Sequence, residues 1–165
     1  MSLLVAAVGA VLASLLETSV LPELHAPIDL VLVFAVTSAM LLSIEEGLTW
    51  AFLGGISLDL LVAGDRPLGI TPLCLLLTTA LAIIVARLTQ PPRVLVVMVT
   101  VLVLTYVYHG LLGLMVAATQ GVSLDGLTFT DLTVSAVFNM LLAGLLARGI
   151  TLMRQRAVPM EHVLR

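Results

Sequence analysis

Six long apolar stretches, separated by short polar turns, constrain this chain more than any other feature. A helix that crosses the hydrocarbon core of a bilayer needs about 20 predominantly apolar residues, and each stretch is close to that length. We therefore expect an all-α integral membrane protein, a six-transmembrane-helix bundle in one domain. The expected spans are residues 2–21, 28–44, 47–63, 68–86, 94–118 and 132–153.

The composition is also that of a membrane protein. Of the 165 residues, 61% are hydrophobic and only 10% are charged, against about 45–50% and about 25% in soluble domains. A soluble fold of this size could not cover so much apolar surface with so few charges. The net charge of -3 argues against a nucleic-acid-binding surface. The single cysteine, Cys74, rules out a disulfide within the chain.

Residues that interrupt helices separate the expected spans. Pro22 and Pro27 bracket the first turn, and residues 64–67 and 90–93 each contain proline as well. The pair Glu45-Glu46, just before Gly47, marks the second turn. Proline cannot continue a helix cheaply, and Asp-Gly pairs such as the one in the fifth loop favour turns.

The placement of arginine predicts the orientation of the bundle, because positive charge collects on the cytoplasmic side of a membrane. With both termini in the cytoplasm, including a tail at 154–165, only Arg66 lies on the outer side. The inner side then holds Arg87, Arg93, Arg148, Arg154, Arg156 and Arg165. The acidic residues around the first loop, Glu17, Glu23 and Asp29, are then expected to face the periplasm.

Asp59 is the polar residue most out of place, because it lies inside the third expected span. A charged side chain there costs about 2.5–3.5 kcal/mol. Gly47, Ala51, Gly55 and Ala63 share its four-residue spacing, so all five lie on one helical face. Small residues on such a face let a neighbouring backbone approach closely. Asp59 should therefore face protein, either as a tether to neighbouring helices or as a proton or substrate site, and the missing relay favours the tether.

Depth along the expected helices suggests partners for Asp59. At about 1.5 Å rise per residue, His109 and Asn139 fall at a similar depth, and Arg66 can reach back from the outer turn. We interpret His109 as a hydrogen-bonded packing residue rather than a metal ligand, since too few ligands converge for a metal site. The chain contains no phosphate-binding loop, nucleophile elbow or His-Glu-x-x-His helix, so neither an enzyme nor a cofactor is expected.

Two short motifs carry a family resemblance. A glycine-rich third helix is followed by Asp-Leu-Leu and then by Pro-Leu-Gly, which opens the next helix: Gly54, Gly55, Asp59, Leu60, Leu61, Pro67, Leu68 and Gly69. An earlier Leu-Pro and Pro-x-Asp-Leu are Leu21, Pro22, Pro27, Asp29 and Leu30, with Ile28 interrupting the Pro-Asp pair. Together with the length and the six spans, these motifs resemble the rod shape-determining MreD family. Beyond residue 75, the resemblance is one of hydropathy and length.

The resemblance implies a non-enzymatic scaffold of the elongasome, the machinery that controls cell shape and lateral cell-wall synthesis. Its location would be the bacterial inner membrane. The implied partners are an MreC-like single-span protein, MreB, the RodA–penicillin-binding-protein synthase and membrane lipids. We expect the structural or partner-binding residues to include Asp59, Gly54, Gly55, Gly47, Ala51, Pro67, Gly69, Pro27, Asp29 and His109.

Two other functions remain open. The MreD family is similar in fold to the substrate-binding subunits of energy-coupling-factor vitamin transporters, so a small-molecule-binding transporter subunit is the alternative. Those subunits carry small residues four apart on the first helix, and this chain has Ala6, Ala10 and Ser14 there. A membrane-embedded enzyme is the third possibility, which no motif supports.

Overall fold

The computed structural model describes residues 3–21, 27–62, 68–89, 93–120 and 129–156. Within these ranges the chain forms helices and no strand, so the predicted all-α class is confirmed. The helices are α1 Leu3–Ser19, α2 Leu30–Leu41, α3 Ile44–Leu61, α4 Ile70–Leu88, α5 Val94–Gln120 and α6 Phe129–Arg156. The described ranges leave out several residues singled out from the sequence: Pro22, Glu23, Ala63, Arg66, Pro67 and Arg165.

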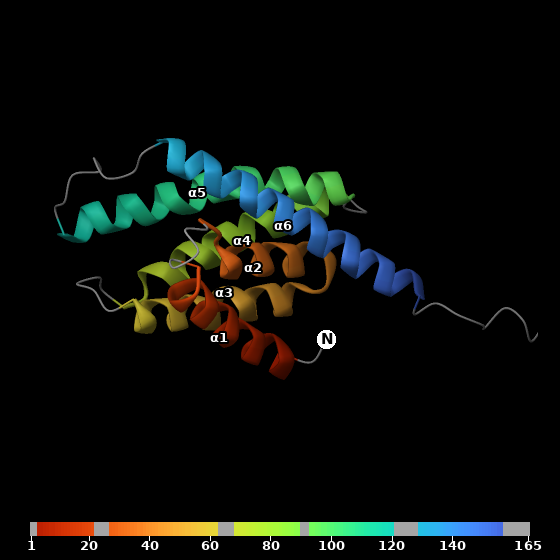
Figure 1. Ribbon diagram of the computed structural model, residues 1–165, viewed down its shortest axis with the longest axis horizontal. Coiled ribbons are helices and arrows are strands. Elements are labelled where there is room, and N and C mark those ends of the chain that lie inside the picture. The colour runs from red at the N-terminus through yellow and green to blue at the C-terminus, as the bar shows by residue number, and fades with distance from the viewer. Residues whose placement is uncertain (1–2, 22–26, 63–67, 90–92, 121–128, 157–165) are drawn as a thin grey trace, which may run out of the picture.

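The helices run alternately in opposite directions along one bundle axis, so that α1 begins and α6 ends at the same end (Figure 1). α3 packs against α1, α2 and α4, whereas α5 and α6 pair with each other and lie against α2. α5 also contacts α4. The bundle thus consists of a four-helix core, α1–α4, and an α5–α6 hairpin packed on it.

α2 occupies the centre of the bundle and contacts each of the other five helices. Its sequence has no charged residue, and every residue from Val31 to Leu41 except Phe34 is buried. A helix that is apolar all round has no face suited to water and is expected in an interior. α2 has 12 residues, so it is roughly 18 Å long at 1.5 Å per residue.

The start of α3 differs from the sequence prediction, which placed Glu45 and Glu46 in a turn. The helix begins at Ile44, with both carboxylates in its first turn. The Ser43 hydroxyl accepts a hydrogen bond from the Glu46 N–H at 3.1 Å. Ser-x-x-Glu is the sequence pattern of a capping box, and acidic residues stabilise a helix N-terminus. Residues 42 and 43 alone therefore form the turn after α2.

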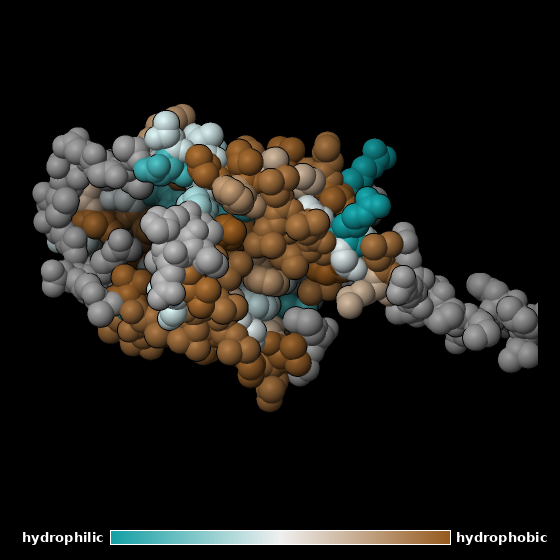
Figure 2. Space-filling model, viewed as in Figure 1, coloured by the Kyte–Doolittle hydropathy of each residue, from teal (hydrophilic) through white to brown (hydrophobic). Residues whose placement is uncertain are grey.

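Three helices are long and apolar enough to cross a membrane by length and composition: residues 70–88, 94–119 and 129–153. α1 and α2 are shorter apolar helices, and α3 carries the carboxylates of Glu45, Glu46 and Asp59. Large hydrophobic side chains are exposed on α1, α3, α4, α5 and α6. Figure 2 shows these apolar side chains over much of the middle of the molecule, with hydrophilic ones mostly toward its ends.

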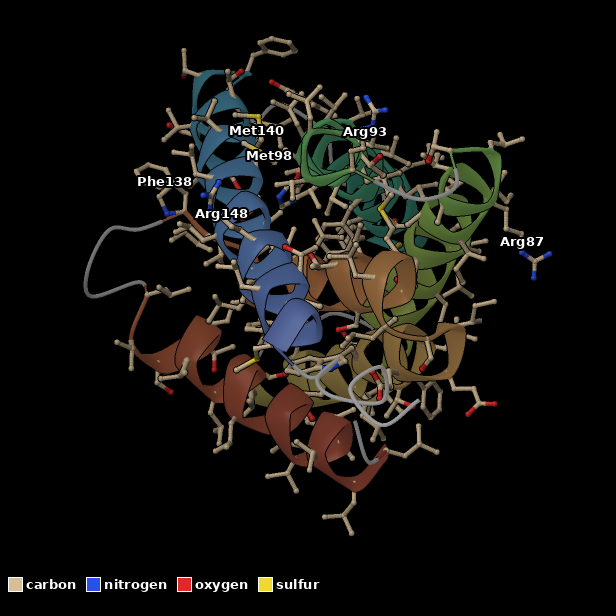
Figure 3. The ribbon with its side chains drawn as sticks, turned by 90° about the vertical axis from the view of Figure 1, so that its right-hand side faces the viewer. Arg87, Arg93, Met98, Phe138, Met140 and Arg148 are labelled. Atoms are coloured by element: carbon tan, nitrogen blue, oxygen red, sulfur yellow. The ribbon has the colours of Figure 1, made fainter. Side chains whose placement is uncertain are left out.

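The two ends of the bundle differ in charge. Arg87, Arg93 and Arg148 are exposed near the same end, which we call the arginine end (Figure 3). The opposite half carries carboxylates on α1, α3 and α6 and just before α2, and we call it the acidic end. Its described carboxylates are Glu17, Asp29, Asp59 and Asp131.

Candidate functional site

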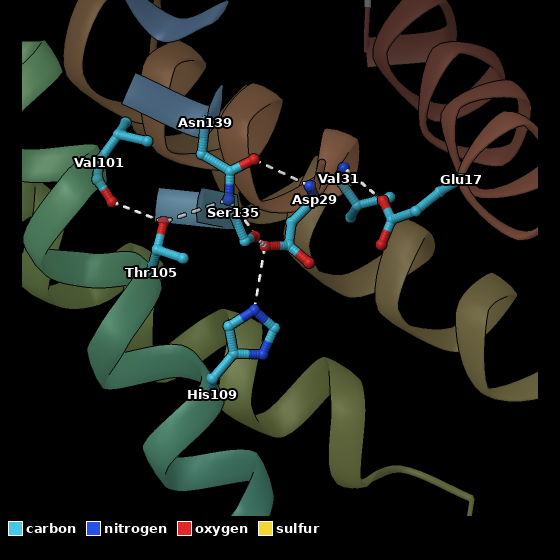
Figure 4. A network of polar contacts seen from close by, with 8 residues as sticks. All are labelled: Glu17, Asp29, Val31, Val101, Thr105, His109, Ser135 and Asn139. Carbon is cyan, nitrogen blue, oxygen red and sulfur yellow. Dashed lines mark hydrogen bonds and ion pairs between the residues drawn. The ribbon is translucent and has the colours of Figure 1, made fainter. Parts of the chain in front are cut away.

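Asp29, immediately before α2, is the centre of a polar network at the acidic end (Figure 4). Its Oδ2 accepts hydrogen bonds from Asn139 Nδ2 at 2.7 Å and from Ser135 Oγ at 3.1 Å. His109 Nε2 lies 3.1 Å from the same oxygen. Because all three partners belong to α5 or α6, this one carboxylate oxygen links the start of α2 to the α5–α6 hairpin.

Asn139 makes this link in two ways. While its Nδ2 donates to the Asp29 carboxylate, its Oδ1 accepts a hydrogen bond from the Asp29 backbone N–H at 2.9 Å. Nδ2 also lies 3.3 Å from Thr105 Oγ1, which in turn donates to the Val101 carbonyl at 2.9 Å. Asn139 is fully buried, and these opposed donor and acceptor roles fix the orientation of its amide.

Glu17 brings α1 into the same region. Its Oε2 accepts a hydrogen bond from the Val31 backbone N–H at 3.0 Å. Asp29 sits at the N-cap position of α2 but makes no side-chain capping bond to its own helix. The first N–H groups of a helix have no partner within the helix, so Glu17 supplies from α1 the cap that Asp29 does not. From the sequence Glu17 is expected only to face the periplasm, and no local pattern indicates this capping role.

The contact between Asp29 and His109 joins two ionisable side chains of the network. The side chain of Asp29 is 17% exposed and that of His109 is 20% exposed, so neither is fully buried. Their 3.1 Å contact becomes an ion pair when His109 is protonated. The imidazole also lies against the ring of Tyr108, with the two centroids 5.1 Å apart. The network is therefore a charged helix-to-helix contact at the edge of the bundle core.

Asp59 lies outside this network and connects α3 to α4. Its Oδ2 accepts a hydrogen bond from the Gly69 backbone N–H at 2.7 Å. Gly69 is the N-cap of α4 and has φ of 103°, a conformation that glycine adopts without the steric cost of a Cβ. The motif residues Asp59 and Gly69 therefore shape the α3–α4 corner together.

The expectation that His109 and Asn139 lie beside Asp59 is wrong, because both bind Asp29 instead. Among the described residues, α3 has no contact with α5 or α6, since α2 and α4 lie between them. Depth along the bundle axis does not determine the lateral position of a helix, so it could not identify the partner of Asp59.

The small residues of α3 lie where other helices approach most closely. A methyl group placed on Gly55 would be 2.5 Å from Pro72 Cα and 2.7 Å from Pro72 N, both backbone atoms of α4. A methyl group on Gly47 would meet the backbone of Ala39 in α2. Ala51, between the two glycines on this face, is fully buried.

Gly54 extends the close packing of α3 to α1 and α2. A methyl group on Gly54 would collide with Val31 of α2. The Gly54 carbonyl accepts a hydrogen bond from Ser14 Oγ of α1 at 3.0 Å. α3 therefore needs small residues on more than one side, because three helices pack against it.

In chemical terms, the carboxylates of Glu17, Asp29 and Asp59 at the acidic end join helices. No group of three or more His, Cys, Asp or Glu side chains in the described ranges is placed to hold a metal ion. Pro27 lies two residues before Asp29 in the segment that leads into α2.

No family model, curated protein or solved structure matches this chain. Its function is therefore inferred from the geometry and the sequence motifs.

Proposed function

We propose that this chain is a non-enzymatic membrane scaffold of the bacterial elongasome, resembling MreD, that holds an MreC-like single-span protein in the inner membrane. MreB and the RodA–penicillin-binding-protein synthase are the further partners of such an assembly. One observation carries the proposal: the polar residues of both sequence motifs are used in helix-to-helix contacts. A scaffold depends on a fixed arrangement of helices, and these contacts provide it.

The motif at residues 54–69 supports the proposal through the α3–α4 corner. Gly55 allows backbone contact with Pro72, and Asp59 binds the N–H of Gly69. Close backbone approach at glycine is a principal source of stability between membrane helices, where lipid and side chains are equally apolar. The resemblance in this segment therefore has a physical basis in packing.

The motif at residues 27–30 supports it through the Asp29 network. Asp29 binds side chains of α5 and α6, and it does so just before the central helix α2. Carboxylates at membrane depth are retained where they pair with neighbouring groups. The network aligns the α5–α6 hairpin with the four-helix core, so a partner would meet a single rigid surface.

In this proposal all six helices cross or line the membrane, with the arginine end in the cytoplasm. α2 is enclosed by five helices and has little contact with lipid, so it does not need the length of a lipid-exposed span. The positive-inside rule sets the orientation. We expect a reporter fused after Arg165 to be active only in the cytoplasm. Periplasmic activity of that fusion would contradict the orientation.

The transporter alternative gains no support from the first helix. The small residues Ala6, Ala10 and Ser14 are fully buried in the helix that packs against α3. Ser14 also donates hydrogen bonds to the carbonyls of Ala10 and Gly54. Packing within the chain thus accounts for the pattern that suggested a transporter subunit.

Detergent co-purification from native membranes, followed by identification of the retained proteins, tests the scaffold proposal. We expect a single-span coiled-coil protein to remain bound. Retention of ATPase subunits in its place would favour the transporter. Recovery of the folded chain with neither kind of partner would contradict both proposals.

Asp59→Asn separates a tether from a proton carrier in the same assay. The asparagine Oδ1 can still accept the Gly69 N–H, so we expect normal partner retention and normal rod shape in a strain that lacks the wild-type protein. Asp59→Leu leaves that N–H without its acceptor and should lower stability by about 1 kcal/mol, since the bond is exposed. A well-expressed Asn variant that loses rod shape would favour the proton carrier.

A further inference from the structure

Three arginines with described side chains lie at the arginine end, and their guanidinium groups have no partner among the described residues. Arg87 in the last turn of α4, Arg93 just before α5 and Arg148 of α6 are all exposed. None of the three guanidinium groups makes a hydrogen bond or ion pair with any residue in the described ranges. Figure 3 shows the three side chains apart from one another around the α4–α5–α6 side of this end. They do not converge on one point inside the protein.

A strongly exposed leucine lies within three residues of each of these arginines. Leu88 next to Arg87 is 80% exposed, and Leu95, two residues after Arg93, is 71% exposed. Leu145, one helical turn before Arg148, is 72% exposed. The guanidinium groups therefore stand at the boundary between an apolar surface and the end of the bundle. Arginine beside membrane-facing apolar surface keeps its charged group at the headgroup level.

At the arginine end, the start of α3 carries acidic residues instead of basic ones. The turn between α2 and α3 leads into a first helical turn that contains Glu45 and Glu46. Glu45 is exposed, and Glu46 is buried. Anionic groups are thus unfavourable near the α2–α3 turn and favourable along α4, α5 and α6, so the charge is distributed unevenly around the end.

We propose that Arg87, Arg93 and Arg148 bind the phosphates of anionic phospholipids, which gather along the α4–α5–α6 side of the arginine end. This proposal rests on the part of the proposed function that places the chain in a membrane. It does not depend on any of the proposed protein partners. Guanidinium groups match phosphate geometry and form charge-assisted hydrogen bonds with it. The apolar leucines beside them provide the contact for the acyl chains of the same lipids.

The test uses the full chain reconstituted in vesicles of equal phosphatidylglycerol and phosphatidylcholine, with a spin-labelled lipid of either type as the probe. We expect the wild-type protein to associate severalfold more with the phosphatidylglycerol probe. Each neutralised arginine should remove part of this preference, because each cation near an anionic surface contributes at most about 1 kcal/mol, or about fivefold. The triple variant R87Q/R93Q/R148Q should show little preference.

Two matched variants control for charge and folding. The variant R87K/R93K/R148K retains the charges and should retain most of the preference. Glu45→Gln removes an exposed charge at the same end and should not reduce it. Each protein is compared by its size-exclusion profile, and the three single Arg→Gln variants replace the triple variant if that does not fold.

An unchanged phosphatidylglycerol preference in the folded triple variant would overturn the proposal. If that variant also loses the co-purified protein partner, the arginines would be assigned to an acidic protein segment instead. Because lipid preference is measured on the isolated chain, its failure leaves the scaffold proposal standing, and failure of the scaffold test leaves the lipid result standing.

Discussion

Gly55→Leu is expected to remove most of the folded protein from the membrane. A Cβ at this position would lie 2.5 Å from Pro72 Cα and 2.7 Å from Pro72 N, and backbone atoms cannot swing aside as a side chain can. Overpacking typically costs about 1–3 kcal/mol. The contact has no room even for a Cβ, and leucine adds three more carbon atoms beyond it. Stability is normally only about 5–15 kcal/mol in total, so the loss should be visible in immunoblots of membrane abundance and in thermal unfolding in detergent.

Two alanine substitutions provide the matched comparison. Gly55→Ala adds only the clashing carbon and should be intermediate between wild type and Gly55→Leu. Gly110→Ala is made in an exposed part of α5, where an added Cβ meets nothing within 4 Å. Because alanine is favoured over glycine in a helix by about 0.5–1 kcal/mol, this variant should be as stable as wild type or slightly more so. Equal abundance of Gly55→Leu and Gly110→Ala would contradict the close α3–α4 contact.

The helices were largely predictable because their signals are local. Residues 68–86 were expected as a span and form α4, Ile70–Leu88. α2 is shorter than expected at both ends: its span was expected at 28–44 and the helix is observed at Leu30–Leu41. Just before the start of α2, the Asn139 side chain accepts a hydrogen bond from the Asp29 backbone N–H. Asn139 is far along the chain from Asp29, so no local sequence pattern encodes this contact. At the end of α2, the Ser43 cap begins a new helix, and this Ser-x-x-Glu signal was present in the sequence.

The candidate site was predictable only in part, for a related reason. The small-residue face of α3 follows from four-residue spacing, which is a property of one helix. The partner of Asp59 depends on which helices are neighbours, and hydropathy contains no such information. His109 and Asn139 were correctly grouped by depth, but the central position of α2 brings them to Asp29. The role of Glu17 as a cap for α2 likewise depends on the packing of α1 beside that helix.

The Asp29 network should show a graded response to substitution. Ser135→Ala removes one of the three partners of Asp29 Oδ2 and should lower the free energy of unfolding by about 1 kcal/mol. Asn139→Leu removes a donor to the carboxylate and the acceptor for the Asp29 N–H. Each buried group left unsatisfied costs about 1–3 kcal/mol, so this variant should lose severalfold more stability than Ser135→Ala in thermal unfolding.

Asp29→Leu completes the series and has the largest expected effect in it. It leaves the donors of Ser135 and Asn139 without their shared acceptor and removes the anion that faces His109. Each donor left without its acceptor costs about 1–3 kcal/mol, and loss of the anion adds to this cost when His109 is protonated. If the network is one unit, the double variant Asp29→Leu/Asn139→Leu should lose less than the sum of the two single losses. Strictly additive losses would show that the two residues stabilise the bundle independently. The contacts between the α5–α6 hairpin and α2 would then not form one cooperative network.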